Sequence, residues 1–202
     1  MNDISNKIQN TSLLILGAGG HGRVVAETAE LIGKWDRISF LDDNMNLSKV
    51  LDFDVIGKLN DFEKFRNEFD FAVVAIGDNM TRIQWLDRLK CVGYRIPVIV
   101  HPQAIISKYA IVKEGTIVLP GAVVNTNSKI GRGCIINLNA CVDHDCEISE
   151  GVHISAGAVI RSMCKIGRLS VIGASCCVPS GTQLDDGYIL PDGKVVEFGA
   201  NL

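Results

Sequence analysis

Residues 130–154 read IGRGCI-INLNAC-VDHDCE-ISEGVH-I, and every group of six begins with isoleucine or valine. The same step runs unbroken from Ile106 to Leu190, where fifteen consecutive positions six residues apart hold Ile, Val or Leu. Glycine recurs one or three places after many of these positions, and a mostly small residue stands two places before them. A period this regular predicts a solenoid of short strands and turns, in which no coil folds without its neighbours.

Three such faces make a coil of about eighteen residues, so the repeats form nearly five coils and a prism about 24 Å tall. Each coil is expected to bury one aliphatic side chain per face on the axis. Four of the seven cysteines occupy the small positions of this lattice: Cys134, Cys146, Cys164 and Cys176. We therefore expect these four to pack as small core residues and not to form disulfides.

A different pattern occupies the chain before His101-Pro102. Apolar runs predict strands at 12–16, 38–41, 71–76 and 96–100, and helical patterns follow the first and the third. This alternation is typical of a parallel sheet with right-handed crossovers. At roughly a hundred residues the region is half of a full dinucleotide-binding domain. We expect a Rossmann-like α/β half domain at 1–103 and an all-β domain at 104–202.

Composition and charge narrow the classes of partner. A formal net charge of −3 provides no basic footprint for nucleic acid. The apolar run Leu13–Leu16 is far too short for a signal or membrane helix, which predicts a cytoplasmic protein without membrane contact. The sequence holds no Cys-x-x-Cys pair, so we expect no metal site.

A glycine-rich loop, Gly17-Ala18-Gly19-Gly20-His21-Gly22, joins the first predicted strand to the first helix. Glycines allow close backbone approach to a phosphate, and a helix N-terminus offers free N–H groups. Asp42 and Asp43 follow about twenty residues later, where a ribose-binding carboxylate stands in dinucleotide folds. Because the second half of such a fold is missing, the pattern favours a nucleoside diphosphate sugar over NAD. A purely structural strand-to-helix turn is the other interpretation.

The triplet Asp143-His144-Asp145 comes directly after the aliphatic Val142, which places His144 at a coil edge and not in the core. A neighbouring carboxylate orients an imidazole and favours the protonated form that a general base must adopt. Taken alone, the triplet fits a solvated charged turn as well. His153, nine residues later, fits either a contact to a ligand or an exposed coil residue.

Together the glycine loop, Leu41-Asp42-Asp43, Ala75-Ile76-Gly77-Asp78-Asn79 and the hexapeptide repeats resemble the PglD/NeuD-like family of sugar O- and N-acyltransferases. The resemblance implies a left-handed parallel β-helix and a homotrimer, with acetyl-CoA bound in the cleft between adjacent prisms. The chain departs from the family after Leu190, where Pro191-Asp192-Gly193 replaces the usual close of the β-helix.

The resemblance also implies roles for individual residues. His144 matches the general base and Asp145 its acidic partner, while His153 matches a histidine that contacts acetyl-CoA near the thioester. Gly173 and Ala174 are assigned to the same CoA site, and Asn137 matches a residue close to the acceptor amine. The positions implied for the sugar nucleotide are Gly19, Gly20, His21, Asp42, Asp43 and Gly77.

The expected activity is therefore acetyl transfer from acetyl-CoA to a nucleotide-linked amino sugar, without a metal, in bacterial glycan or glycoprotein sugar synthesis. The closest branch suggests a UDP-linked 4-amino-4,6-dideoxy sugar; GDP- or dTDP-linked amino sugars and O-acetylation of sialic acid stay open. A γ-type carbonic anhydrase needs three histidines, and the repeats hold only His144 and His153. A non-catalytic sugar-nucleotide-binding protein is the other alternative, against which His144, Asp145 and His153 count.

Overall fold

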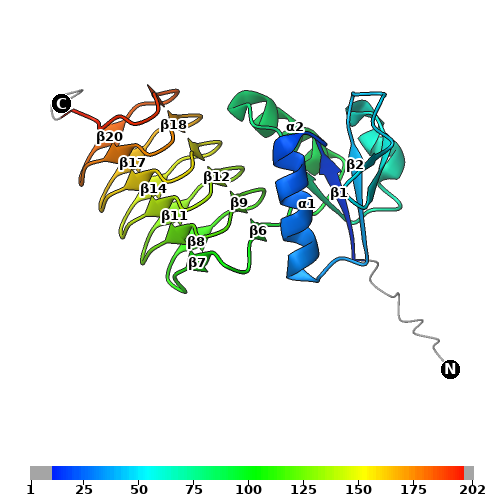
Figure 1. The fold of residues 1–202 in the computed structure, drawn as a ribbon, viewed down its shortest axis with the longest axis horizontal. Coiled ribbons are helices and arrows are strands. Elements are labelled where there is room, and N and C mark those ends of the chain that lie inside the picture. The colour runs from blue at the N-terminus through cyan, green and yellow to red at the C-terminus, as the bar shows by residue number, and fades with distance from the viewer. Residues whose placement is uncertain (1–10, 198–202) are drawn as a thin grey trace.

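The computed structural model describes residues 11–197, so residues 1–10 and 198–202 of the two expected domains lie outside the described residues. An α/β domain lies beside a prism of stacked coils, as Figure 1 shows. Among the described residues, no helix is long and apolar enough to cross a membrane. The two-part architecture and the β-helix predicted from the sequence are both confirmed.

The α/β domain is built on a five-stranded sheet in the order β3-β4-β2-β1-β5. The strands are β1 (Ser12–Leu16), β2 (Arg37–Leu41), β3 (Lys49–Val50), β4 (Phe53–Gly57) and β5 (Phe71–Val74). All pair in parallel except β3, which is antiparallel to β4. The helices are α1 (Gly20–Ile32), the 3-10 helix η1 (Leu59–Phe65) and α2 (Asn79–Cys91).

Alternate residues of β1 serve two separate cores, which explains why this strand is apolar throughout. Leu13 and Ile15 pack with α1 on one face of the sheet. Leu14 and Leu16 pack with α2 and η1 on the other face. A strand covered by helices on both sides has no solvent-facing positions, so the strand reads as a continuous hydrophobic run.

The expected fourth strand, 96–100, is wrong as a member of this sheet. Arg95 makes only a single bridge to Phe71. The following strand, β6 (Ile99–Val100), pairs with β9 (Ile117–Val118) and begins the β-helix instead. Pro97 lies inside the expected strand and has no N–H to donate to a sheet ladder, which accounts for the break. The strands β3 and β4 and the helix η1, within residues 49–65, were not predicted from the sequence.

The coils form a left-handed β-helix with three faces of short parallel strands. The first face contains β6, β9, β12 (Ile135–Ile136), β15 (His153–Ile154), β18 (Val171–Ile172) and β21 (Ile189–Leu190). The second face contains β7 (Ile105–Ile106), β10 (Val123–Val124), β13 (Cys141–Val142), β16 (Val159–Ile160) and β19 (Cys177–Val178). The third face contains β8 (Ile111–Val112), β11 (Lys129–Ile130), β14 (Glu147–Ile148), β17 (Lys165–Ile166) and β20 (Gln183–Leu184).

The aliphatic lattice predicted from the sequence forms the core of the prism. The second residue of each strand points inward, and those from Val118 to Leu190 are buried in one continuous cluster. The four lattice cysteines are buried at the corners among them, and all seven cysteines are free thiols. The predicted packing role of these cysteines is therefore confirmed.

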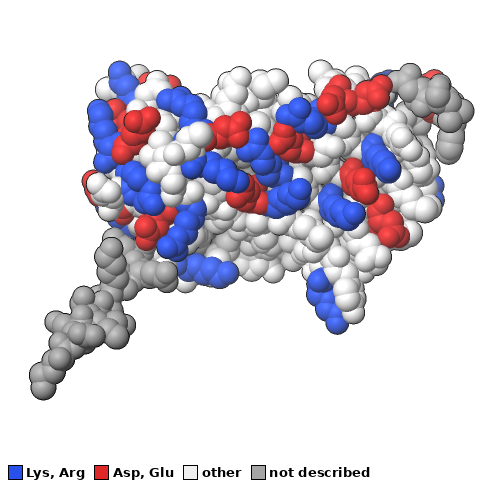
Figure 2. Space-filling model, turned by 180° about the vertical axis from the view of Figure 1, so that it is seen from behind, with Lys and Arg blue, Asp and Glu red and all other residues white. Residues whose placement is uncertain are grey.

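The outward residues give each face a different character. On the first face Ile99 and Ile117 are buried in a core shared with the α/β domain, and Ile135 is buried as well. The second face presents Ile105, Val123, Cys141, Val159 and Cys177, with Ile105 65% and Val159 39% exposed. The third face carries a mixed row of charge in which Lys129 pairs with Glu147. Basic and acidic side chains are intermingled on the side of the molecule that Figure 2 shows.

Helix α2 joins the two domains by packing on the corner that leads into the first face. Ile83 and Leu86 lie against Gly115, Gly133 and Gly151, which succeed one another at this corner of three coils. Gly133 has a φ of 62°, and a Cβ there would lie 2.5 Å from Leu86 Cδ1. The glycine therefore satisfies both the left-handed turn and the close approach of the helix.

Replacing Gly133 with alanine should lower the free energy of unfolding by about 2–4 kcal/mol, because it combines backbone strain with overpacking against Leu86. For a chain of this size that loss corresponds to a fall in Tm of about 5–15 °C. Gly181→Ala is the matched control, since Gly181 has a φ of 76° but nothing within 4 Å of a Cβ. Equal falls in Tm for the two variants would show that the α2 contact does not restrict position 133.

Candidate active site

The glycines of the loop between β1 and α1 divide into two kinds. Gly17 has a φ of 101°, and a Cβ at Gly22 would lie 2.1 Å from the Gly17 carbonyl oxygen, so both are required by the turn itself. Gly19, Gly20 and Gly77 have nothing within 4 Å of a Cβ. Nothing in the chain itself therefore requires glycine at these three positions, which fits the approach of a ligand.

The N-terminus of α1 is open to an anion, whereas that of α2 is not. Gly19 is the N-cap residue of α1 and supplies no side-chain cap. At α2, by contrast, the Asp78 carboxylate accepts a hydrogen bond of 2.8 Å from the Thr81 amide. The first N–H groups of α1 are left for another partner, and a phosphate is the group that such an end binds best.

Asp42 and Asp43 both help to hold this region together. The Asp42 carboxylate accepts hydrogen bonds from the amides of Ala18 (2.7 Å) and Asn44 (2.8 Å). Asp43 accepts one from the amide of Leu59 at 3.1 Å. Asp42 also lines a pocket of 260 Å³ with Asn44 and Lys58 at the end of β2. Asp42 therefore stabilises the glycine loop, through its bond to the Ala18 amide, beside this cavity.

Three of the predicted site residues meet between the domains. His153 points outward from the first face, and Asn137 lies one coil earlier, with its Nδ2 3.1 Å from His153 Nε2. His21 extends from the start of α1, and its Nε2 is buried without a hydrogen-bond partner in the described residues. A buried nitrogen of this kind is available to a substrate.

Both of these histidines are neutral at pH 7. Burial lowers the pKa of His21 to about 4, and the positive charge of Arg82 adds to the effect. Burial likewise lowers the pKa of His153 to about 4, again with a contribution from Arg82. A neutral imidazole keeps one lone pair, and His153 uses it to accept from Asn137 Nδ2, so the unpartnered Nε2 of His21 is the ring nitrogen left for a ligand.

His144 and Asp145 form a second centre at the corner between the second and third faces. Asp145 has a φ of 59°, a left-handed conformation that aspartate tolerates better than most residues. Its carboxylate lies 2.7 Å from His144 Nδ1 and also accepts a bond from Asn127. The bond to Asp145 raises the pKa of His144, whose side chain is 44% exposed. With Nδ1 donating to Asp145, Nε2 is free to take up a proton.

A single chain does not bring the two centres together. Strands eighteen residues apart stack directly, as Ile135 does on His153, so eighteen residues make one turn of the prism. His144 and His153 are nine residues apart, which is half a turn. His144 therefore occupies a corner of the prism, and His153 lies on the face opposite that corner.

Gly173 and Ala174 lie at the corner that follows the first face, two coils beyond Asn137. A Cβ at Gly173 would lie 2.6 Å from the Asp192 amide and the Leu190 carbonyl oxygen, so the stacking of coils requires this glycine. The Ala174 amide donates to Asp192 Oδ1 at 2.7 Å. Asp192 belongs to the segment in which the sequence departs from the family pattern.

Sequence reasoning gave no role to Arg82 or Asn79, which are both buried between the domains. The sequence feature that could have revealed them is the presence of polar residues at positions 79 and 82, on the face of α2 that also carries the buried Ile83 and Leu86. As for metals, nowhere in residues 11–197 do three or more His, Cys, Asp or Glu side chains gather in a group that could hold an ion.

Comparison with known proteins gives one family match and several relatives. Residues 12–89 match the PglD N-terminal domain family. The acetyltransferase domain of PglB from Neisseria gonorrhoeae FA1090, a solved structure, is 38% identical with a TM-score of 0.90. The match covers 93% of this chain and 92% of that one. The same domain has also been solved in complex with acetyl coenzyme A.

Two curated proteins are also similar. GDP-perosamine N-acetyltransferase from Escherichia coli O157:H7 is 28% identical over 67% of this chain. UDP-N-acetylbacillosamine N-acetyltransferase from Bacillus subtilis (strain 168) is 29% identical over 54% of this chain. The chain spans 63% and 51% of the lengths of these two relatives.

The two neutral histidines should make stability depend on pH. In the unfolded chain each takes up a proton near pH 6.5, but in the folded chain only near pH 4. Their contribution is therefore present above pH 6.5 and lost on acidification, by up to about 1.4 kcal/mol per pH unit for each ring.

Denaturant unfolding of His153→Gln between pH 4.5 and 7 should show a flatter dependence of stability on pH than the wild type. His144→Gln is the control, because its pKa is shifted in the opposite direction and its loss cannot flatten the curve in this way. Parallel curves for the wild type and His153→Gln would mean that folding does not lower the pKa of His153.

Proposed function

This chain belongs to the PglD/NeuD-like family of hexapeptide-repeat sugar acyltransferases, and on that basis we propose that it transfers the acetyl group of acetyl-CoA to the amino group of a nucleotide-linked sugar. The observation that carries the proposal is the His144–Asp145 pair, in which the carboxylate holds Nδ1 and leaves Nε2 free. A relative that binds acetyl coenzyme A and two that are named as N-acetyltransferases of nucleotide sugars support it.

The reaction needs a base and no covalent enzyme intermediate. The sugar amine attacks the thioester carbonyl carbon, a C–N bond forms, and the C–S bond breaks as the tetrahedral intermediate collapses. His144 Nε2 takes the proton that the nitrogen must lose and returns it to the departing CoA sulfur, which is released as the thiol. The raised pKa of His144 makes it a stronger proton acceptor than an isolated imidazole.

We place the acceptor on the side of the α/β domain where His21 meets Asn137 and His153 of the first face. The open N-terminus of α1 and the open positions Gly19, Gly20 and Gly77 suit a pyrophosphate and sugar. The pocket beside Asp42 suits the nucleoside. Asn137 and neutral His153 then lie where the sugar amine meets the acetyl group, with Gly173 and Ala174 further along the same side for CoA.

The separation of His144 from His153 supports a homotrimer with sites between subunits. The base of one subunit then acts on an acceptor bound on the first face of its neighbour. The apolar second face, with Ile105 and Val159 exposed, provides a surface for such an assembly. The cytoplasmic location expected from the sequence belongs to this proposal as well, and seven free thiols suit a reducing compartment.

The nucleotide is proposed to be UDP, as the sequence suggested, with GDP as the alternative. The named relatives include one enzyme for each nucleotide. Both relatives are N-acetyltransferases, which favours an amine acceptor over the hydroxyl of sialic acid. The three-histidine site of a γ-type carbonic anhydrase has no counterpart in residues 11–197.

The test is an assay in which UDP- and GDP-linked 4-amino-4,6-dideoxy sugars are incubated with acetyl-CoA. Acetylation is measured by the release of free thiol. His144→Ala should lower kcat by about 10²–10⁴-fold with little change in the KM for the sugar nucleotide, because a positioned base acts in the chemical step. Asp145→Asn should lower kcat less than His144→Ala, because it removes only the carboxylate that orients the base. Asparagine also tolerates the left-handed turn at this position, so the turn is kept. His153→Ala should instead raise the KM for acetyl-CoA.

The alanine at position 144 opens no core cavity, so a folded variant is expected. Full turnover by such a variant would show that His144 is not the base. Failure of the wild type with every nucleotide-linked amino sugar would instead favour a non-catalytic binding protein.

A further inference from the structure

Arg82 is fully buried at the boundary of the two domains, and every one of its N–H groups has an acceptor. Nε donates to the Gly133 carbonyl at 2.7 Å, and Nη1 donates to the carbonyls of Ile76 and Gly77 at 3.0 and 2.9 Å. Nη2 donates to Asn79 Oδ1 at 2.7 Å and to the Gly151 carbonyl at 3.0 Å. These acceptors are all neutral, so the guanidinium is held by hydrogen bonds and not by an ion pair with a carboxylate.

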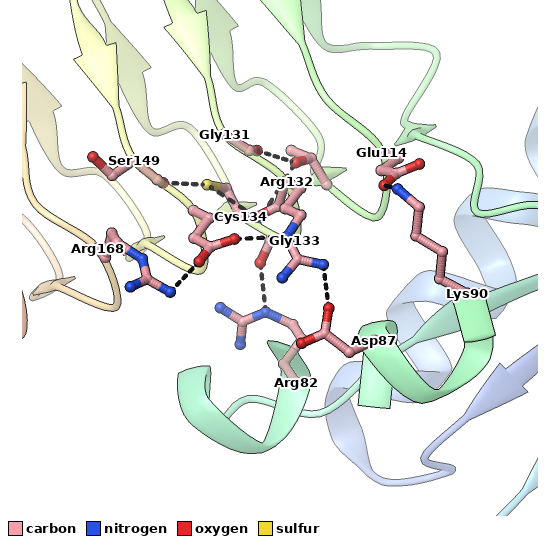
Figure 3. Close-up of polar contacts among 12 residues, drawn as sticks. Arg82, Asp87, Lys90, Glu114, Gly131, Arg132, Gly133, Cys134, Ser149 and Arg168 are labelled. Carbon is pink, nitrogen blue, oxygen red and sulfur yellow. Dashed lines mark hydrogen bonds and ion pairs between the residues drawn. The ribbon is translucent and has the colours of Figure 1, made fainter. Parts of the chain in front are cut away.

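The acceptors of Arg82 come from both domains. Ile76 and Gly77 form the turn that follows β5, while Gly133 and Gly151 lie at coil corners two residues before β12 and β15. Figure 3 shows Arg82 reaching from α2 to the Gly133 carbonyl, beside the peripheral pair Asp87–Arg132. A short path therefore runs from the Gly77 turn through one side chain to His153, the first residue of β15.

Asn79 extends the same contact to the next coil. Its Nδ2 donates to the carbonyls of Leu169 at 2.8 Å and Ser170 at 3.1 Å, while its Oδ1 accepts from Arg82. The pair thus binds three successive corners on one edge of the prism. This edge is already rigid, because the amides of Gly133 and Gly151 donate to the coils before them.

The position of the Gly77 turn, unlike that of the coil corners, depends on its hydrogen bonds to the guanidinium. Arg82 donates to two successive carbonyls of this turn, and a Cβ at Gly77 would have nothing within 4 Å. We propose that Arg82 is a positioning residue for acetyl transfer, which fixes the acceptor-binding turn at Gly77 against the coil corners leading to His153. This inference rests on the proposed function, and it concerns the acceptor and not the acetyl donor.

Kinetics of Arg82→Met and Arg82→Lys test the proposal. We expect Arg82→Met to raise the KM for the nucleotide-linked amino sugar by about tenfold or more and to lower kcat, since a displacement of about 1 Å has effects of this order. The KM for acetyl-CoA should stay within about twofold. Lysine has three donors in place of five and should restore only part of the acceptor KM.

The matched control is Asp87→Asn, which weakens another contact from α2 to the β-helix, the 2.6 Å pair with Arg132. It should leave both KM values and kcat unchanged, because Arg132 keeps Glu150 and the Gly77 turn is untouched. If Arg82 only stabilised the fold, Arg82→Met would lower the active fraction without changing either KM. That result, with an active wild type, would overturn the inference.

A wild type that acetylates no amino sugar would instead contradict the proposed function and leave the inference without its basis. If Arg82→Met does not fold, Asn79→Ala replaces it, since this variant keeps the guanidinium but removes one of its two Nη2 acceptors and the bonds to Leu169 and Ser170. It should raise the acceptor KM by several-fold with an unchanged acetyl-CoA KM. An unchanged acceptor KM in folded Asn79→Ala would overturn the inference.

Discussion

The burial of one aliphatic side chain at every sixth position determines where each functional group of this protein can lie. It fixes the coil at three faces, so that residues eighteen apart stack and residues nine apart lie on opposite sides. His144 and His153 are separated in this way by half a turn. The same packing that makes the prism stable therefore prevents one chain from completing the proposed site, and the apolar second face supplies a surface on which a second copy can complete it.

The second constraint is the close packing of α2 on the prism. Gly133 and Gly151 give the helix room, and Arg82 uses their carbonyls to hold the Gly77 turn at a fixed place. The charge that serves this purpose also lies near two buried histidines and helps to keep both neutral. Domain packing and turn geometry thus depend on one side chain, which also adds to the effect of burial on the pKa of His21 and His153.

The sequence predicted the parts of the molecule that repeat or that bury a continuous apolar run. The β-helix, its cysteine-lined corners, β1 and the helix after the glycine loop follow directly from such patterns. The strand expected near Pro97 was placed in the wrong sheet, since local hydrophobicity does not specify the partner of a strand. Arg82 was missed because the partners of a buried guanidinium lie far away in sequence, at Gly133 and Gly151, where only the fold brings them together.

The central claim is that one subunit supplies His144 and its neighbour supplies the acceptor site, and mixed trimers test this most directly. His144→Ala would be co-assembled with Gly77→Trp, whose indole fills the open space at the acceptor-binding turn. Each variant alone should be inactive, while random mixing should restore activity at about a quarter of the sites, because those pair an intact His144 with an intact acceptor site. Mixing Gly77→Trp with the double variant should restore none. Mixed trimers that form but stay inactive would contradict the account.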